Sequence, residues 1–374
     1  MTKKESVLNF FLCALCAAAV AFSLAEPAAA GEAAFAALSL CARRVVPGVF
    51  LFMAAAKIFA ACGGEHLFAR VTCRAFEKLF GVSESGAAVI FLGLLSGYPA
   101  GAAVAGAYLK AGTLSRAEAE RILPFATAAS PAFLLGSVGA ILGDVRAGGI
   151  LLAAQWASAV LLLLFTRGKS PAPARSVRAR GSAKPLSAIT AALRESGMAV
   201  VNICSYVTFF YVFSAMLLSL LPAHAGQGFW GALIAGILEI SCGFARLAAL
   251  RAGAARFFAG GLMLGFAGFS VFLQSADALG SAELSMKKYL LGKIAQAFAT
   301  ALFAVLFGSL SFGEVSAGAG LFLGEAHARV AALWEICAVF LAFALVLTLI
   351  LIFLIKILTF FKKIFKKLWK KNNL

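Results

Sequence analysis

Charged residues are scarce in this chain of 374 residues. Asp, Glu, Lys and Arg make up only 13% of it, whereas hydrophobic residues make up 62% and the mean hydropathy is +0.96. A soluble globular domain carries about a quarter charged residues. The composition therefore excludes an ordinary soluble domain and predicts an all-α integral membrane protein.

The sequence also lacks the motifs of common catalytic and metal sites. It has no P-loop, no nucleophile elbow and no paired carboxylates, and its three histidines are isolated from one another. The eight cysteines are scattered, and Cys13 and Cys16 lie within an apolar run, where small apolar side chains are the simplest interpretation. These absences predict a protein that is neither an enzyme nor an ATP-driven pump, with no cofactor and no metal.

The basic residues are unevenly placed. The formal net charge is +17, and Lys and Arg cluster at the ends of apolar runs. Such clusters orient a chain in a membrane and meet anionic lipid headgroups, so nucleic-acid binding is not predicted. Segment 167–185 holds six Lys and Arg and no acidic residue among Pro, Ser and Gly. It is interpreted as a cytoplasmic linker between two halves; phosphate or RNA binding is the alternative.

Eight segments are predicted to span the membrane, because each is an apolar run of about 17 or more residues. They are 6–25, 45–61, 116–142, 148–166, 199–221, 257–275, 289–310 and 330–356. Lys3, Lys4 and the Lys-rich C-terminal tail favour cytoplasmic termini in a multi-pass protein of the cell membrane. The N-terminus also has features of a signal peptide, but its apolar stretch of about 20 residues favours a retained helix.

Two further apolar regions are interrupted and too short to span. One is broken at Gly97-Tyr98-Pro99, and the other, "FWGALIAGILEISCGFARLAAL", is broken near Glu239. Each predicts a re-entrant hairpin.

The two halves of the chain are similar. "GLLSGYPAG" can be aligned with "GILEISCG", and each half reads as span, hairpin, span, span. An odd number of crossings predicts an inverted repeat, as in many secondary transporters. The predicted parts are 1–42, a first repeat at 43–166, the linker at 167–185, a second repeat at 186–310, and 311–374 with a final span and basic tail.

The prolines at the breaks indicate helix starts. Proline costs nothing in the first turn of a helix, so Pro99 suits the start of the second hairpin arm. Ser130-Pro131 predicts that the span at 116–142 consists of two half-helices. Freed N–H groups at membrane depth must find partners, which predicts a protein-enclosed polar cavity that would attract a polar or anionic solute.

Glu239 is the most informative single residue, because a carboxylate at membrane depth is costly. It could bind solute hydroxyls, a coupling cation or a proton; alternatively it accepts from broken-helix N–H groups or pairs with Arg246. The other candidates lie at the breaks or are polar within apolar runs, where helix packing is the competing role. The predicted solute-binding set is Gly97, Tyr98, Pro99, Gly101, Ser130, Pro131, Asn202, Glu239, Ser241, Gly243, Ser270 and Gln274.

At these residues the chain resembles a known family. "GLLSGYPAGAAVAGAYLKAGTLSRAEAERILPFATAASPAFLLGSVG", with "GILEISCG", "FAGFSVFLQ" and "YLLGKIAQ", is similar to YlbJ-type sporulation integral membrane proteins. That family belongs to the nucleoside-recognition (Gate) domain group. The resemblance covers roughly 45–310, and "LEISCG" stands where the family has "LEITxG". It implies a protein of endospore-forming bacteria, needed for spore cortex formation and moving a small solute.

Two functions from different classes follow. The first is a transporter-like protein that moves a small polar or anionic solute, with nucleoside-like compounds as one class. The second is a membrane scaffold that recruits partners for cortex formation through its basic linker and tail. The expected partners are a small-molecule solute, anionic lipid headgroups and a coupling ion, Na⁺ or H⁺; association into a homo-oligomer is left open.

Overall fold

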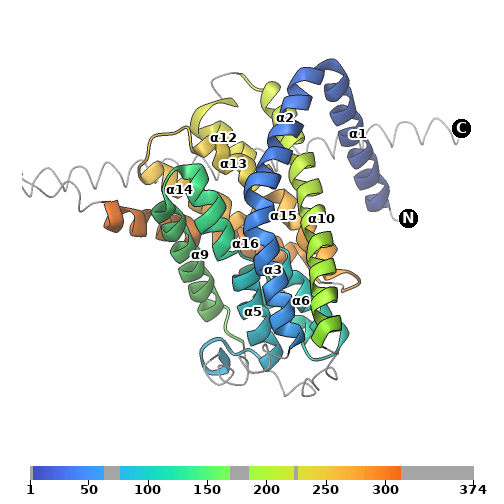
Figure 1. Ribbon diagram of the computed structural model, residues 1–374, viewed down its shortest axis with the longest axis vertical. Coiled ribbons are helices and arrows are strands. Elements are labelled where there is room, and N and C mark those ends of the chain that lie inside the picture. Colours follow the sequence, from blue (N-terminus) through green and yellow to red (C-terminus); the bar gives the residue numbers. More distant parts are fainter. Residues whose placement is uncertain (1–2, 63–75, 169–184, 223–225, 283, 313–374) are drawn as a thin grey trace, which may run out of the picture. The chain divides into compact units, whose positions relative to one another are not determined.

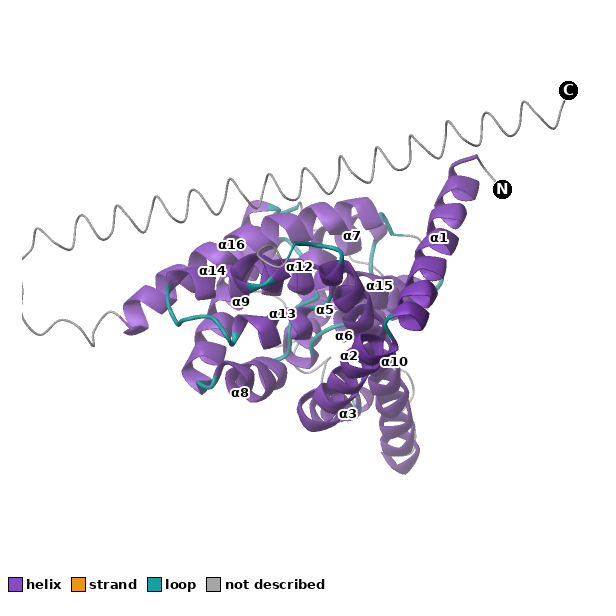
Figure 2. Ribbon diagram, turned by 90° about the horizontal axis from the view of Figure 1, so that it is seen from above, coloured by secondary structure: helices purple, strands orange, loops and turns teal. Residues whose placement is uncertain are grey.

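A computed structural model describes residues 3–62, 76–168, 185–222, 226–282 and 284–312. These residues are helical, with no strand among them, which confirms the all-α prediction (Figure 2). Contacts divide the chain into two units, Met1–Gly31 with Ser316–Leu374, and Glu32–Val315. In the first unit the structure describes α1 (Lys3–Ala25) and the start of α2 (Pro27–Leu40). The second unit holds the candidate site.

Four helices in the described residues are long and apolar enough to cross a membrane, judged by length and composition. They are α9 (Val145–Phe165), α10 (Pro185–Ser219), the pair α14 and α15 (Ala254–Phe266 and Gly268–Leu279), and α16 (Met286–Phe312). A fifth arises if α2, the π-helical turn η1 (Cys41–Val45) and α3 (Val46–Ala61) count as one bent span. The chain is thus a helical membrane protein with several spans; the predicted span at 330–356 lies outside the described residues.

The first predicted hairpin is a pair of short helices. In α5 (Glu84–Ser96), the Ser83 hydroxyl accepts a hydrogen bond from the Gly86 amide at 3.1 Å and caps the helix start. The helix ends at Gly97, whose φ of 83° favours glycine, and α6 (Ala100–Lys110) follows. In Figure 1 the two helices lie at the lower end of the second unit, beside α3 and α10.

The second predicted hairpin is also present. It consists of α12 (Gly228–Leu238) and α13 (Ile240–Leu247), which join at Glu239 in an extended conformation. Its helices lie at the upper end of the second unit in Figure 1. The two hairpins therefore occupy opposite ends of this unit.

Two longer helices are broken. The first runs as α7 (Arg116–Ala126), stops at Thr127, and resumes at Pro131 as the π-helical turn η2 (Phe133–Val138) and α8 (Gly139–Leu142). This confirms the break at Ser130-Pro131. The second was predicted as one span over 257–275, and this was incomplete, because α14 ends at Ala267, with φ 72°, before α15 begins. This break was not predicted, because no proline marks the position.

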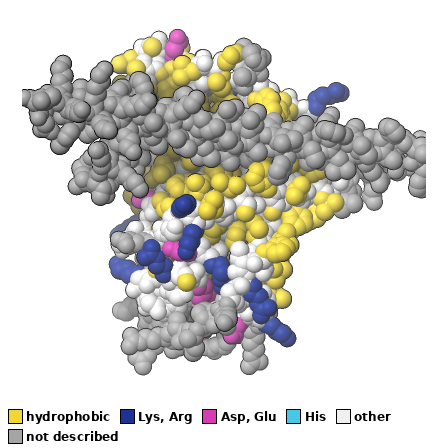
Figure 3. All heavy atoms as spheres, turned by 180° about the vertical axis from the view of Figure 1, so that it is seen from behind, with side chains coloured by type: hydrophobic (Ala, Val, Ile, Leu, Met, Phe, Trp, Pro, Cys, Tyr) yellow, Lys and Arg dark blue, Asp and Glu magenta, His cyan; other side chains and the backbone are white. Residues whose placement is uncertain are grey.

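The charged surface is concentrated at one end. On the face in Figure 3, hydrophobic side chains form a broad area, and most visible Lys and Arg side chains lie below it with acidic residues among them. Glu120 of α7 forms ion pairs with Arg116 at 3.2 Å and Lys288 at 2.7 Å. Hydrogen bonding from Lys288 lowers the pKa of Glu120 to about 2.

Candidate functional site

Glycines bring the two arms of each hairpin together. A Cβ on Gly93 or Gly101 would collide with the Ala126 carbonyl oxygen at the end of α7. In the second hairpin, a Cβ on Gly236 or Gly243 would collide with Met263 of α14 or with the facing glycine. In both hairpins, therefore, the arms cross at a glycine pair and pack on the broken helix that follows. Gly101 and Gly243 serve this packing.

The first hairpin tip lies against the break of the following helix. A Cβ on Gly97 would be 2.8 Å from the Ser130 nitrogen, so only glycine allows this approach. The Tyr98-Pro99 peptide bond is cis. The Ser130 hydroxyl accepts from the Phe133 amide at 3.2 Å and caps the half-helix that begins at Pro131. The tip and a helix N-terminus are therefore adjacent.

At the second tip, Glu239 is 1% exposed. Its carboxylate accepts a hydrogen bond from the Cys242 amide at 2.8 Å, which caps α13. Arg246 donates instead to the Gly226 carbonyl at 3.3 Å, and the described residues show no ion pair between Arg246 and Glu239. Of the structural alternatives for Glu239, acceptance from broken-helix N–H groups is the one observed.

The two tips meet around a small cavity of about 40 Å³, which is large enough for roughly one water molecule. The Tyr98 hydroxyl donates to the Leu264 carbonyl at 3.3 Å, across the two halves. In a continuous helix that carbonyl would accept from the amide four residues later, but the break at Ala267 leaves it free. The predicted residues that line this cavity are Gly97, Tyr98, Ser130, Glu239, Ser241 and Gln274.

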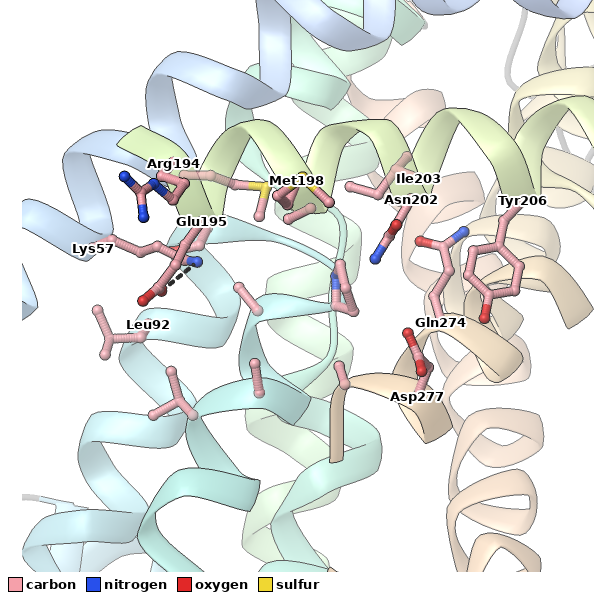
Figure 4. A pocket seen from close by; sticks show the side chains of 18 residues that line it. Lys57, Leu92, Arg194, Glu195, Met198, Asn202, Ile203, Tyr206, Gln274 and Asp277 are labelled. Atoms are coloured by element: carbon pink, nitrogen blue, oxygen red, sulfur yellow. Dashed lines mark hydrogen bonds and ion pairs between the residues drawn. The ribbon is translucent and has the colours of Figure 1, made fainter. Parts of the chain in front are cut away.

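A wider cavity of about 430 Å³ adjoins the small one and shares Ser96, Ile203 and Gln274 with it. Asn202 and Tyr206 of α10 face Gln274 and Asp277 of α15 at one end of it (Figure 4). At the other end, Lys57 of α3 and Glu195 of α10 form an ion pair at 2.9 Å. The wider cavity thus has a polar inner end next to the hairpin tips and a charged outer end.

The remaining predicted residues support these walls. Pro99 and Asn202 line the wider cavity. Ser270 is fully buried and accepts a hydrogen bond from the Gln274 amide at 3.0 Å, which orients a side chain common to both cavities. Pro131 opens the half-helix after Ser130. The predicted set is therefore close together in space, and within it Gly101, Gly243, Ser270 and Pro131 lie outside the linings of these two cavities.

The sequence reasoning missed Lys293 of α16, which is 1% exposed. Its ammonium group donates to the carbonyls of Thr127 at 2.8 Å and Pro124 at 3.2 Å, and to Gln296 Oε1 at 2.8 Å. It also lies 5.9 Å from the centre of the Tyr98 ring. Its signal was available, because Lys293 is a charged residue within the predicted span at 289–310.

A buried hydrogen-bond network continues from this lysine. The Thr127 and Tyr289 hydroxyls are 3.0 Å apart, and Tyr289 donates to the Ser275 hydroxyl at 3.2 Å. The Ser158 and Thr300 hydroxyls connect α9 and α16 at 2.7 Å. These contacts fix α16 against α7, α15 and α9, so the polar interior extends beyond the two tips.

Comparison with known proteins gives one curated relative. The chain is 26% identical over 321 residues to "Sporulation integral membrane protein YlbJ" of Bacillus subtilis (strain 168), covering 76% of this chain and 78% of that protein. This supports a YlbJ-type assignment. No family model matches the chain, and no solved structure matches it. The name of that protein describes an integral membrane protein, which agrees with the long apolar helices of this chain.

Proposed function

We propose that this YlbJ-type chain binds a small polar or anionic solute between its two hairpin tips and moves it across the membrane during sporulation. The observation that carries the proposal is that three helix breaks, at Tyr98, Ser130 and Glu239, line one small cavity, and that the Tyr98 hydroxyl connects them to the Leu264 carbonyl at the fourth break. Irregular backbone at membrane depth is tolerated where it is buried in protein or lines a cavity. Helices broken near the midplane are the usual construction of transporter binding sites.

An inverted repeat in the membrane accounts for the paired features. α5 and α6 correspond to α12 and α13, and the breaks after α7 and α14 correspond to each other. The packing is paired in the same way: α6 contacts α15 and α13 contacts α8, while α3 packs on α10 and α9 packs on α16. Together with the predicted segments outside the described residues, this supports eight spans and two hairpins, with both termini on the cytoplasmic side.

The lining residues favour a hydroxylated or amide-bearing solute. In the small cavity Glu239 can accept from hydroxyl or N–H groups and the Tyr98 ring gives an aromatic surface. Asn202 lines the wider cavity and Gln274 lines both, and these two amides can donate and accept. The wider cavity lies within the usual volume range of small-molecule sites, about 300–1,000 Å³. Nucleoside-like compounds, which combine a ring with hydroxyl groups, are one class that fits this chemistry.

The test is solute binding and uptake by the purified full chain. A solute panel would be screened by its effect on the apparent melting temperature, and hits would be measured for uptake into proteoliposomes. Glu239→Gln should lower affinity or uptake at least roughly tenfold, because a carboxylate acceptor is lost from a buried site. Glu32→Gln is the matched control, because it removes an exposed carboxylate that lines neither cavity.

The scaffold alternative makes a different prediction. If Glu239→Gln supports sporulation as well as the unmodified chain, while deletion of 167–184 abolishes it, the transporter proposal is wrong. If solute binding and uptake fall only in Glu239→Gln, and both proteins accumulate in the membrane equally, the proposal stands.

A further inference from the structure

Lys293 is held in the way that proteins hold a monovalent cation. Its ammonium nitrogen has three neutral oxygen neighbours, the carbonyls of Thr127 and Pro124 and the amide oxygen of Gln296, at 2.8 to 3.2 Å. The Tyr98 ring lies within the distance of about 6 Å that is typical of a cation–π contact. Among the described residues no carboxylate forms an ion pair with it. The positive charge is therefore neutralised by dipoles alone.

The break after α7 makes two of these three oxygens available to Lys293. In a continuous helix the Thr127 carbonyl would accept from the amide of residue 131, but residue 131 is a proline and has no N–H. The chain also leaves the helical path at Thr127, which frees the Pro124 carbonyl from its partner four residues later. The Thr127 carbonyl at the negative end of α7 thus points into the protein interior and requires a donor or a cation, whereas the Pro124 carbonyl also accepts from the Thr127 hydroxyl at 3.3 Å.

The corresponding break in the other half needs no charge. There the freed Leu264 carbonyl accepts from the neutral Tyr98 hydroxyl. Since one break is satisfied by a hydroxyl, satisfying freed carbonyls alone does not require a buried cation. Burying the Lys293 ammonium at the α7 break costs more free energy than burying a hydroxyl. Its presence there therefore indicates a role beyond satisfying the carbonyls.

We propose that the Lys293 ammonium permanently occupies a monovalent-cation site formed by the Pro124 and Thr127 carbonyls and the Gln296 side chain. The lysine is a positioning residue that keeps the α7 break and the adjacent Tyr98 tip in place without a dissolved cation. The chain therefore folds and holds its site independently of Na⁺ and K⁺. Removal of the side chain beyond Cβ exposes the three oxygens, which then bind an alkali cation.

The experiment measures the apparent melting temperature of the purified full chain in NaCl, KCl and choline chloride at equal ionic strength. The unmodified protein should melt at the same temperature in all three. Lys293→Ala should melt lower in choline chloride and recover by roughly 3 °C or more in NaCl or KCl, because a ligand that binds only the folded state stabilises it. Propylammonium chloride, which replaces the removed atoms, should also restore stability.

Two further variants separate this role from simple packing. Lys293→Met fills the same space without a charge, so it should stay less stable than the unmodified protein and show no recovery in any salt. Lys288→Ala, on the same helix with an exposed side chain, should respond equally to all three salts.

The proposal is overturned by any of three results. These are stabilisation of the unmodified protein by Na⁺ or K⁺ that is as large as that of Lys293→Ala, a Lys293→Met protein as stable as the unmodified one, and a Lys293→Ala protein that no alkali cation stabilises or that fails to accumulate in either alkali salt. Since the readout is stability, these outcomes are independent of whether any solute is bound or moved.

Discussion

The close approach of α5 and α6 in the first hairpin can be tested by adding a single methyl group. Gly93→Ala adds one methyl group where the arms of α5 and α6 meet the end of α7. That methyl carbon would collide with the Ala126 carbonyl oxygen, and it would lie 2.9 Å from the Ala126 carbonyl carbon and 3.2 Å from the Gly101 Cα. All three neighbours are backbone atoms, so no side chain can rotate away, and the arms must separate instead.

The expected loss follows from two opposing effects. Overpacking a tight site costs about 1–3 kcal/mol, whereas replacing glycine by alanine in a helix gains up to about 1 kcal/mol. Gly197→Ala in α10 is the matched control, because a Cβ there has no neighbour within 4 Å and only the gain remains. The two variants should therefore differ by about 2 kcal/mol, or roughly 2–3 °C in melting temperature for a chain of 374 residues.

Fluorescence-detected size-exclusion chromatography after heating would measure this difference in detergent. Gly243→Ala should behave like Gly93→Ala, because its Cβ would lie 2.8 Å from the Gly236 nitrogen in the second hairpin. If Gly93→Ala is as stable as Gly197→Ala, the arms do not cross at this glycine, and the arrangement of the tips described here is wrong.

Two other predictions concern the ends of the molecule. Cysteines introduced at Ala111, after the first hairpin, and at Gln227, before the second, should be labelled from opposite sides of the membrane in a chain that lacks its native cysteines; labelling from one side contradicts the inverted repeat. Glu120→Gln should lower the melting temperature by a few degrees at neutral pH, because the ion pair with Lys288 is lost. The Glu120 pKa is depressed to about 2, so this pair stabilises the protein above about pH 4.5 and less as the pH falls toward 2. The difference between variant and unmodified protein should therefore shrink in acid, and a difference independent of pH would contradict this role.

Several features could be predicted because they depend on local chemistry. The apolar runs on either side of Gly97-Tyr98-Pro99 are too short to span, which predicts a hairpin irrespective of its neighbours. Proline at residue 131 breaks the i to i+4 hydrogen-bond pattern wherever the helix lies. A carboxylate within an apolar run requires a buried partner, which identified Glu239 before its contact with the Cys242 amide was known.

Other features depend on distant parts of the chain. The break at Ala267 has no proline, and the Tyr98 hydroxyl that satisfies the freed Leu264 carbonyl lies 166 residues away in the sequence. The Lys293 charge was visible in the sequence, but its oxygen partners lie on α7, whose break faces α16 only in the folded protein.

The sequence by itself determined that this is a helical membrane protein, that its helices break at Pro99, Pro131 and Glu239, and that a carboxylate lies at one of these breaks. Segment length, proline and the cost of burying a charge decide these features locally. Only the tertiary structure decided which breaks face one another and what satisfies them. The freed carbonyls of one half are satisfied by a hydroxyl and those of the other by an ammonium group, because the nearest available donor depends on how α16 and the Tyr98 tip pack.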